Sequence, residues 1–219
     1  MTAQTDTRVA KTLEALKKNR FGVQHFSQAT AGVAKLLEEI PVEATVGFGG
    51  SWTLMQLQVA EQLEARGNVV YNHNKQGLSK EEVLEMRQKE LSCDVFLTST
   101  NALTAGGQLV NVDGVGNRVS AMVFGPKKVI VFAGVNKIVD DLEGALERIR
   151  AIAAPRNNQR LKLPNPCVQS GRCMNCQGPT RICNVTTIID KKPPLTDLQV
   201  WLVEEELGYS PDPSLVEER

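Results

Sequence analysis

Long hydrophobic runs, histidines and an excess of charge of either sign are scarce or absent in this sequence. Its longest apolar runs, such as residues 129–133, fall far short of the roughly 20 residues that a helix needs to cross a bilayer. The 25 basic and 25 acidic side chains cancel to zero net charge, which argues against a protein that mainly coats nucleic acid or anionic lipid. Two histidines are too few for a histidine-rich metal site. We therefore expect neither a membrane nor a nucleic acid as the main partner.

The first residues are polar and then amphipathic, without the apolar core of a secretory signal, so a cytoplasmic location is expected. Four of the five cysteines lie within residues 167–183. In a reducing compartment, such a crowded set more often binds metal than forms a disulfide framework.

The order of apolar patterns predicts the fold class. Strand-like runs at residues 45–48, 69–71 and 94–98 alternate with helical patterns, and this rhythm favours a mostly parallel, Rossmann-like α/β sheet covered by helices. A chain of 219 residues can bury one real core. We predict a single α/β domain formed by residues 1–155 and 184–208, a cysteine-bearing loop at 156–183 and an acidic tail at 209–219.

The second half of the chain shows a different pattern. Residues 108–113 and 118–124 are both strand-like and flank a Gly-rich turn, which predicts a hairpin. A helix is predicted over residues 140–154, ended by Pro155, with a polar linker at 156–165. Two further strands are expected at residues 186–190 and 198–204.

A glycine-rich turn follows the first buried strand. In the run GFGGSWT, at residues 47–53, backbone N–H groups at the start of a helix could hold an anion, helped by hydroxyl groups. The spacing matches neither a P-loop nor a dinucleotide fingerprint. The other interpretation is a plain tight turn with a serine cap. The candidate ligand-binding residues here are Gly49, Gly50, Ser51 and Thr53.

Polar side chains also gather after the strand at residues 94–98 and around the predicted hairpin. In this group Asp113 is a candidate general base and Arg118 a candidate clamp for a carboxylate or phosphate, and both are our tentative catalytic residues. The alternative is that the hairpin residues only form turns, and that a lone lysine lies on the surface. The further candidate ligand-binding residues are Ser99, Thr100, Asn101, Thr104, Asn111, Asn117, Asn136 and Lys137.

The cysteines follow the spacing C-x5-C-x2-C-x6-C. Four thiolates within 17 residues can surround one tetrahedral ion or one iron–sulfur cluster. We favour a [4Fe–4S] cluster, with zinc as the alternative; free or disulfide-paired cysteines are the remaining interpretation. Cys93 precedes an apolar strand and is expected to be a core thiol. The candidate metal ligands are Cys167, Cys173, Cys176 and Cys183.

Five runs of the sequence are distinctive: VGFGGSWTL at 46–54, NALT at 101–104, LVNVDGVGNR at 109–118, FGPKKVI at 124–130 and GVNKIV at 134–139. Together they resemble the LUD domain family of lactate-utilisation proteins, formerly a domain of unknown function. The similarity covers nearly the whole chain, and the cysteine segment GRCMNCQGPTRICN at 171–184 resembles the tail of a stand-alone subgroup. The resemblance implies a fold like that of the sugar-phosphate isomerase and CoA-transferase superfamily. It also implies a role beside an iron–sulfur oxidoreductase complex that oxidises L-lactate to pyruvate.

Three functions are therefore open. The first is an accessory protein or subunit in the use of lactate or a related 2-hydroxy acid, which binds a small carboxylate or phosphorylated ligand. The second is a free-standing enzyme or sensor on a CoA-transferase-like or isomerase-like scaffold. The third is a zinc-stapled regulator that binds nucleic acid, supported by a basic run and opposed by the zero net charge. The patterns leave self-association open. The basic run comprises Arg156, Arg160, Lys162, Arg172 and Arg181.

Overall fold

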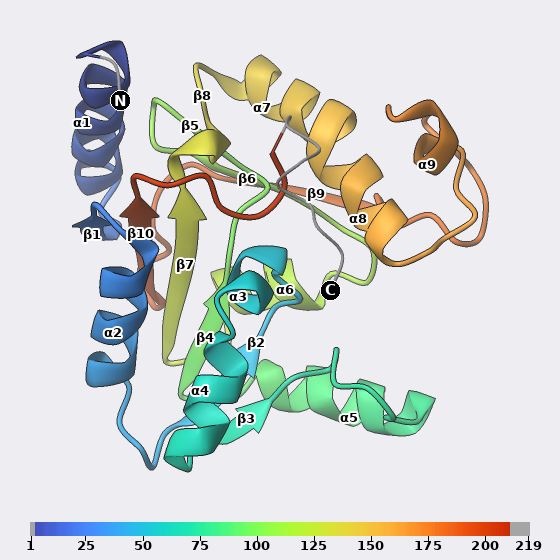
Figure 1. Ribbon diagram of the computed structural model, residues 1–219, viewed down its shortest axis with the longest axis horizontal. Coiled ribbons are helices and arrows are strands. Elements are labelled where there is room, and N and C mark those ends of the chain that lie inside the picture. Colours follow the sequence, from blue (N-terminus) through green and yellow to red (C-terminus); the bar gives the residue numbers. More distant parts are fainter. Residues whose placement is uncertain (1–2, 211–219) are drawn as a thin grey trace.

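A six-stranded sheet forms the centre of the fold (Figure 1). The computed structural model describes residues 3–210, with side chains from residue 7 onward. All neighbouring strands of this sheet run parallel, so the predicted Rossmann-like α/β class is confirmed. In sheet order the strands are β1 (Gly22–Phe26), β10 (Asp197–Val203), β7 (Lys128–Gly134), β4 (Val95–Thr98), β2 (Thr45–Phe48) and β3 (Val69–Tyr71).

Strand β7 explains why its sequence is apolar without interruption. Val129 and Val131 point to one face of the sheet, whereas Ile130 and Phe132 point to the other, and all four are buried. A strand covered on both faces needs apolar residues at every position. The same reasoning accounts for the correct prediction of β2, β4 and β10.

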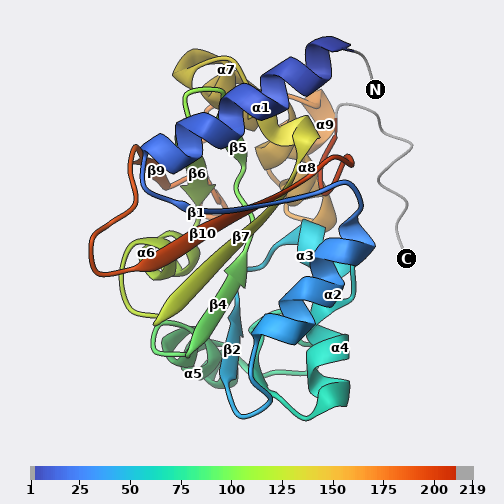
Figure 2. The same ribbon diagram turned by 90° about the vertical axis from the view of Figure 1, so that its left-hand side faces the viewer.

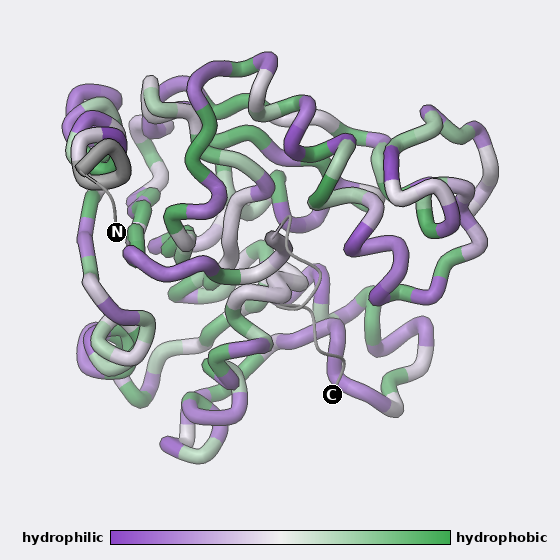
Figure 3. The backbone as a smooth tube through the Cα atoms, turned by 45° about the horizontal axis from the view of Figure 1, so that its top comes forward, coloured by the Kyte–Doolittle hydropathy of each residue, from purple (hydrophilic) through white to green (hydrophobic). Residues whose placement is uncertain are grey.

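Helices cover both faces of this sheet (Figure 2). The first face packs against α2 (Ala29–Glu39), α3 (Trp52–Gln56) and α4 (Val59–Arg66). Helices α5 (Lys80–Glu90) and α6 (Asn117–Val123) lie on the other side, together with α1 (Ala3–Lys18). Figure 3 shows hydrophobic and hydrophilic residues alternating along the outer helices, as expected for helices with one buried face.

A second sheet of four strands packs over the α1 and α6 side. Its Leu103 and Leu109 belong to the same core as α1, whereas Ala102 and Val110 face Ala145 of helix α7 (Leu142–Arg148). This sheet therefore forms an additional layer between the main sheet and α7. Its order is β8 (Ile138–Val139), β5 (Ala102–Thr104), β6 (Leu109–Asp113) and β9 (Val185–Ile189).

The predicted hairpin is wrong in its second half, because residues 118–123 belong to α6 rather than to a strand. The Asp113 carboxylate accepts the Val119 N–H at 3.0 Å and so satisfies one free donor at the start of this helix. The β-branched side chains of Val119 and Val123 favour a strand locally. The hydrogen bond to Asp113 and the burial of Met122 stabilise the helix and outweigh this local preference.

The predicted helix end at Pro155 is also wrong. The backbone continues from α7 through the π-helical turn η2 (Ile149–Ala153) into α8 (Ala154–Arg160), so the first part of the predicted linker at 156–165 is helical. Proline lacks an N–H donor and crowds the preceding turn of a helix. The wider π turn directly before Pro155 accommodates both effects. A short helix α9 (Cys167–Ser170) follows within the cysteine segment.

Within residues 3–210, the structure contains no helix that is both long enough and apolar enough to cross a bilayer. The predicted acidic tail falls mostly on residues 211–219, outside the described residues.

Candidate functional site

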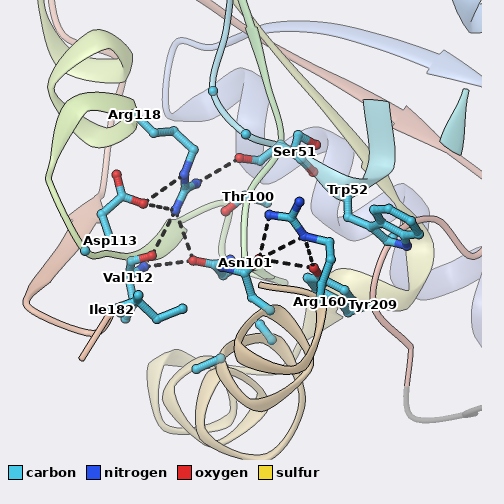
Figure 4. A pocket seen from close by; sticks show the side chains of 18 of the residues that line it. Ser51, Trp52, Thr100, Asn101, Val112, Asp113, Arg118, Arg160, Ile182 and Tyr209 are labelled. Carbon is cyan, nitrogen blue, oxygen red and sulfur yellow. Dashed lines mark hydrogen bonds and ion pairs between the residues drawn. The ribbon is translucent and has the colours of Figure 1, made fainter. Parts of the chain in front are cut away.

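A cavity of about 220 Å³ lies at the carboxyl ends of the central parallel strands (Figure 4). Its wall receives the segments that follow β2, β4, β7 and β10, which are neighbours in the sheet. The ends of parallel strands meet at one edge, and this edge is where open α/β sheets bind ligands. Helix α8 and the end of β6 close the opposite side.

The glycine-rich turn passes directly over Arg118. A Cβ atom at Gly49 would lie 2.9 Å from Arg118 Cγ and 2.8 Å from the Thr98 hydroxyl, so glycine is needed for this close approach. The Ser51 hydroxyl accepts the Leu54 N–H at 3.4 Å and caps α3. The serine cap that the sequence left open is thus present, and the turn also borders the cavity.

Arg118 and Asp113 form an ion pair within the cavity wall. Arg118 Nε and Nη2 donate to Asp113 Oδ1 at 3.0 and 2.7 Å, and both side chains are 11% exposed. Arg118 Nη1 also donates to Asn111 Oδ1 at 2.6 Å and to the Ser99 carbonyl at 3.1 Å. The other Asp113 oxygen caps α6. Arg118 and Asp113 therefore stabilise the cavity wall and also line the cavity.

Lys137 is buried at the inner end of the cavity. Its Nζ donates to the Thr53 hydroxyl at 2.7 Å and to the Ser99 hydroxyl at 2.5 Å. Among the described residues no carboxylate forms an ion pair with Lys137. Burial holds the pKa of Lys137 well below its usual range, because it penalises the charged form, and the positive charges of Arg148 and Arg118 lower the pKa further.

His73 and Glu90 form an oriented pair at the cavity. His73 Nδ1 lies 2.7 Å from Glu90 Oε1, which also accepts the His73 N–H at 3.1 Å. Glu90 is 1% exposed and its other oxygen accepts Asn117 Nδ2 at 3.3 Å. Glu90 orients the imidazole through Nδ1, and the other ring nitrogen, Nε2, lies 3.3 Å from Asn74 Nδ2. This is the arrangement of an oriented general base.

Arg160, Trp52 and Tyr209 lie together in the cavity wall (Figure 4), and Arg148 also lines the cavity. Arg148 donates to the backbone carbonyls of Asn136 and Tyr209, and burial lowers its pKa to about 10. Arg160 donates to the Tyr209 hydroxyl at 2.9 Å. The Tyr209 ring stacks on Trp52, with ring centres 6.4 Å apart. These contacts hold the chain after β10 over the cavity.

The cavity wall is strongly positive. Five cationic side chains border it, whereas Asp113 supplies the carboxylate among the lining residues that the structure describes. Arg87 Nε and Trp52 Nε1 are buried donors that lack a hydrogen-bond partner within the described part of the chain. Donors without a partner in a cavity are ready to bind an acceptor such as a carboxylate or phosphate oxygen. The cationic residues are Arg87, Arg118, Lys137, Arg148 and Arg160.

The structure brings most of the sequence-predicted site residues to this cavity. Three lie elsewhere: Thr104 donates to Gln108 within the turn between β5 and β6, Asn111 supports Arg118 and Asn101 from behind, and Asn136 holds the Leu207 backbone. The predicted residues that border the cavity are Gly49, Gly50, Ser51, Thr53, Ser99, Thr100, Asn101, Asp113, Asn117, Arg118 and Lys137.

Sequence reasoning missed the residues that come from helices and from distant loops. His73, which the sequence analysis assigns to no site, is held by Glu90, which is 17 positions away. Arg87 lies on the polar helix α5, and Arg160 on a segment interpreted as a linker. No spacing within the sequence indicates that these side chains point to one place.

The cysteine segment adjoins the cavity, because Ile182 and Cys183 form part of its wall. All five cysteines are free thiols. Burial, together with the nearby thiols of Cys173, Cys167 and Cys176, raises the pKa of Cys183 to about 11, whereas Arg181 lowers it. Cys93 is buried in the core, and burial raises its pKa to about 12.

The four thiols fit a soft metal or an iron–sulfur cluster by their donor chemistry. Within residues 3–210, however, no three His, Cys, Asp or Glu side chains already stand in a metal-binding arrangement.

The fold and the site together describe an α/β protein with a positively charged cavity at the carboxyl edge of its sheet. The LUD domain family matches residues 9–203, and the chain belongs to this family, which is associated with lactate utilisation in general. The chain is also similar to a DUF162 family protein from Deinococcus radiodurans of known crystal structure. That likeness has 14% sequence identity and a TM-score of 0.49, and covers 91% of this chain and 98% of the other. No curated protein matches the chain.

Proposed function

We propose that this chain binds a small carboxylate or phosphorylated compound in the cavity. We further propose that it acts as an accessory protein or subunit in the use of lactate or a related 2-hydroxy acid. The observation that carries the proposal is the excess of cationic side chains around the cavity, where Asp113 is the one lining carboxylate among the described residues. In a partly buried site such charges are weakly screened, so they favour an anion strongly over a neutral compound.

The unpaired donors support the same ligand class. Arg87 Nε and Trp52 Nε1 are shielded from solvent and have no partner among the described residues. Leaving a buried donor unsatisfied costs about 1–3 kcal/mol, and an anion that accepts from it recovers this free energy. Arg118 is saturated by contacts within the protein, and Arg148 donates to three backbone carbonyls, so both contribute charge more than free hydrogen bonds.

For the cysteine segment we propose a [4Fe–4S] cluster, with zinc as the alternative. The ligands would be Cys167, Cys173, Cys176 and Cys183. A bound cluster would supply one-electron transfer, whereas zinc would stabilise the fold of the cysteine segment. Cys183 also lies in the cavity wall, so the bound group would be close to the ligand. The proposal places the protein in the reducing cytoplasm, with iron–sulfur oxidoreductase subunits as partners.

A ligand panel tests the anion site. We would measure thermal unfolding of the full chain with L-lactate, pyruvate, inorganic phosphate and ribose 5-phosphate, and with neutral lactamide as the control. At least one anion should raise the midpoint in a concentration-dependent way, and lactamide should not. Equal shifts with lactamide, or no shift with any anion, would contradict the proposal.

A second candidate function, a free-standing enzyme or sensor, is favoured by the His73–Glu90 pair. An imidazole oriented by a buried carboxylate is suited to proton transfer, which a pure binding protein does not need. Incubation of each panel ligand with the isolated chain in deuterated water, followed by NMR, distinguishes the two functions. Exchange of a substrate C–H proton that is lost in His73→Gln favours the enzyme. Binding without exchange favours the accessory protein.

The basic run no longer favours nucleic acid. Arg160 faces the cavity and Arg172 pairs with Glu147 at 2.8 Å, so the run does not form one exposed patch.

A further inference from the structure

Lys137 stands apart from the other cations of the cavity. Arg118 is paired with Asp113, and Arg148 donates to backbone carbonyls. The Lys137 amine instead contacts two hydroxyl groups, those of Thr53 and Ser99, at 2.7 and 2.5 Å. A buried lysine that stays protonated normally has a carboxylate partner, because burying an unpaired charge costs much free energy.

The surroundings of Lys137 enclose its amine and lower its pKa. A Cβ atom at Gly208, where φ is +75°, would lie 2.5 Å from the Thr53 hydroxyl and 3.3 Å from Lys137 Nζ. Glycine therefore allows the chain after β10 to close over the amine. Burial and the charges of Arg148 and Arg118 both lower the pKa of Lys137. A lysine with a lowered pKa gives up its proton more readily, and the free amine is a nucleophile.

We infer that Lys137 forms an imine with the carbonyl group of a 2-oxo acid held in the cavity. The inference rests on the proposed anion site, because the same positive wall would hold the carboxylate of that compound. The positive charges that line the cavity would bind the carboxylate group. The enclosed amine would react with the neighbouring carbonyl group, which a simple carboxylate or phosphate lacks.

The chemical step balances with the groups present. The Nζ lone pair attacks the carbonyl carbon, a C–N bond forms, and the carbonyl oxygen takes up a proton that the nitrogen gives up. The Thr53 and Ser99 hydroxyls can pass this proton, since a hydroxyl both donates and accepts. The resulting carbinolamine then loses its hydroxyl group and the second nitrogen proton as water. The net change is amine plus ketone to imine plus water, and no oxidant or reductant is consumed.

The alternative is that Lys137 only binds the anion or only fills the core. Chemical trapping separates these roles, because borohydride reduces an imine to a stable secondary amine and leaves a non-covalent complex unchanged. We would incubate the full chain with pyruvate and sodium borohydride, and measure the intact mass and the modified peptide. L-lactate, which has no carbonyl group to condense, is the control ligand.

The wild type should gain one adduct of about 72 Da, the mass of pyruvate less water plus two hydrogens, on the peptide that contains Lys137. Lys137→Arg places a long cationic side chain at the same position but cannot form this imine, so it should gain none. Lys75→Arg is the matched control at an exposed lysine paired with Glu64, and it should be trapped like the wild type. Peptide mapping of the wild type locates the site even if Lys137→Arg does not fold.

An adduct spread over surface lysines, or none at all, would overturn the inference. A parallel titration by calorimetry separates the two levels of the account. If pyruvate binds but is never trapped, the imine is wrong and the anion site stands. If neither pyruvate nor any other anion of the panel binds, the proposed function fails as well.

Discussion

Arg118 and Asp113 join the end of β6 to helix α6 through one shared oxygen. Arg118 Nε and Nη2 both donate to Asp113 Oδ1, while Asp113 Oδ2 accepts the Val119 N–H. The pair therefore links the second sheet to the helix that covers the main sheet. Two residues that the sequence singles out for chemistry are also part of what holds the site in shape.

Arg118→Ala is expected to lower the free energy of unfolding by about 3–5 kcal/mol, because it leaves the buried Asp113 carboxylate without its partner. Denaturation with urea measures this change. The matched control is Arg172→Ala, which breaks an ion pair whose side chains are 66% and 50% exposed, and which should change stability by about 1 kcal/mol or less. Equal effects of the two substitutions would show that the Arg118 pair carries little of the fold.

Arg87→Gln is expected to weaken anion binding by about tenfold or more, since it removes a charge and an unpaired donor that face the cavity. Stability should change little, because Arg87 Nε has no partner to lose among the described residues. Lys80→Gln removes the same charge from an exposed position on the same helix, α5. Calorimetric titration of both variants is the measurement. If Lys80→Gln weakens binding as much, the effect is only one of net charge.

Lys137→Met should change how stability depends on pH. Between the lowered pKa of folded Lys137 and its ordinary unfolded value, the unfolded state binds one proton that the folded state does not. Wild-type stability therefore rises with pH in this window, by up to about 1.4 kcal/mol per pH unit, and falls as the pH decreases. Lys137→Met lacks this contribution, so its advantage at neutral pH should shrink toward pH ~10. A difference in stability between the two proteins that is the same at all pH values would contradict a lowered pKa of Lys137.

Cys176→Ser is expected to abolish metal binding, because it removes one member of the close Cys-x2-Cys pair. Iron, acid-labile sulfide and zinc are measured per chain after anaerobic purification. About four irons with four sulfides in the wild type indicate the cluster, and one zinc indicates the staple. Cys93→Ala is the control, since this thiol is buried in the core away from the cysteine segment and should leave the metal content unchanged. Full occupancy in Cys176→Ser would rule out the proposed ligand set.

The sequence is sufficient to predict the strands that the sheet buries on both sides. The runs at 45–48 and 129–133 have apolar residues on both faces. This pattern is typical of a parallel strand that helices cover on both sides. The sequence is insufficient where a tertiary contact outweighs the local preference for a helix or a strand. The β-branched residues of α6 favour a strand, and the helix depends on the carboxylate of Asp113, which only the fold brings there.

The candidate site divides in the same way. Residues that directly follow a strand, such as Ser99 and Lys137, are predictable because parallel strands end at one edge. His73, Arg87 and Arg160 are not, because their direction depends on how α5 and α8 pack. The sequence shows no periodicity that links the loop after β3 to Glu90 near the end of α5.

The most direct test of the account is calorimetric titration of the full chain with L-lactate, pyruvate, inorganic phosphate and ribose 5-phosphate, repeated with Arg87→Gln. The account predicts saturable binding of at least one of these anions with one site per chain, weakened by about tenfold or more in Arg87→Gln. Absence of saturable binding for all four anions, or equal affinity in the variant, would contradict the claim that this cavity is an anion site.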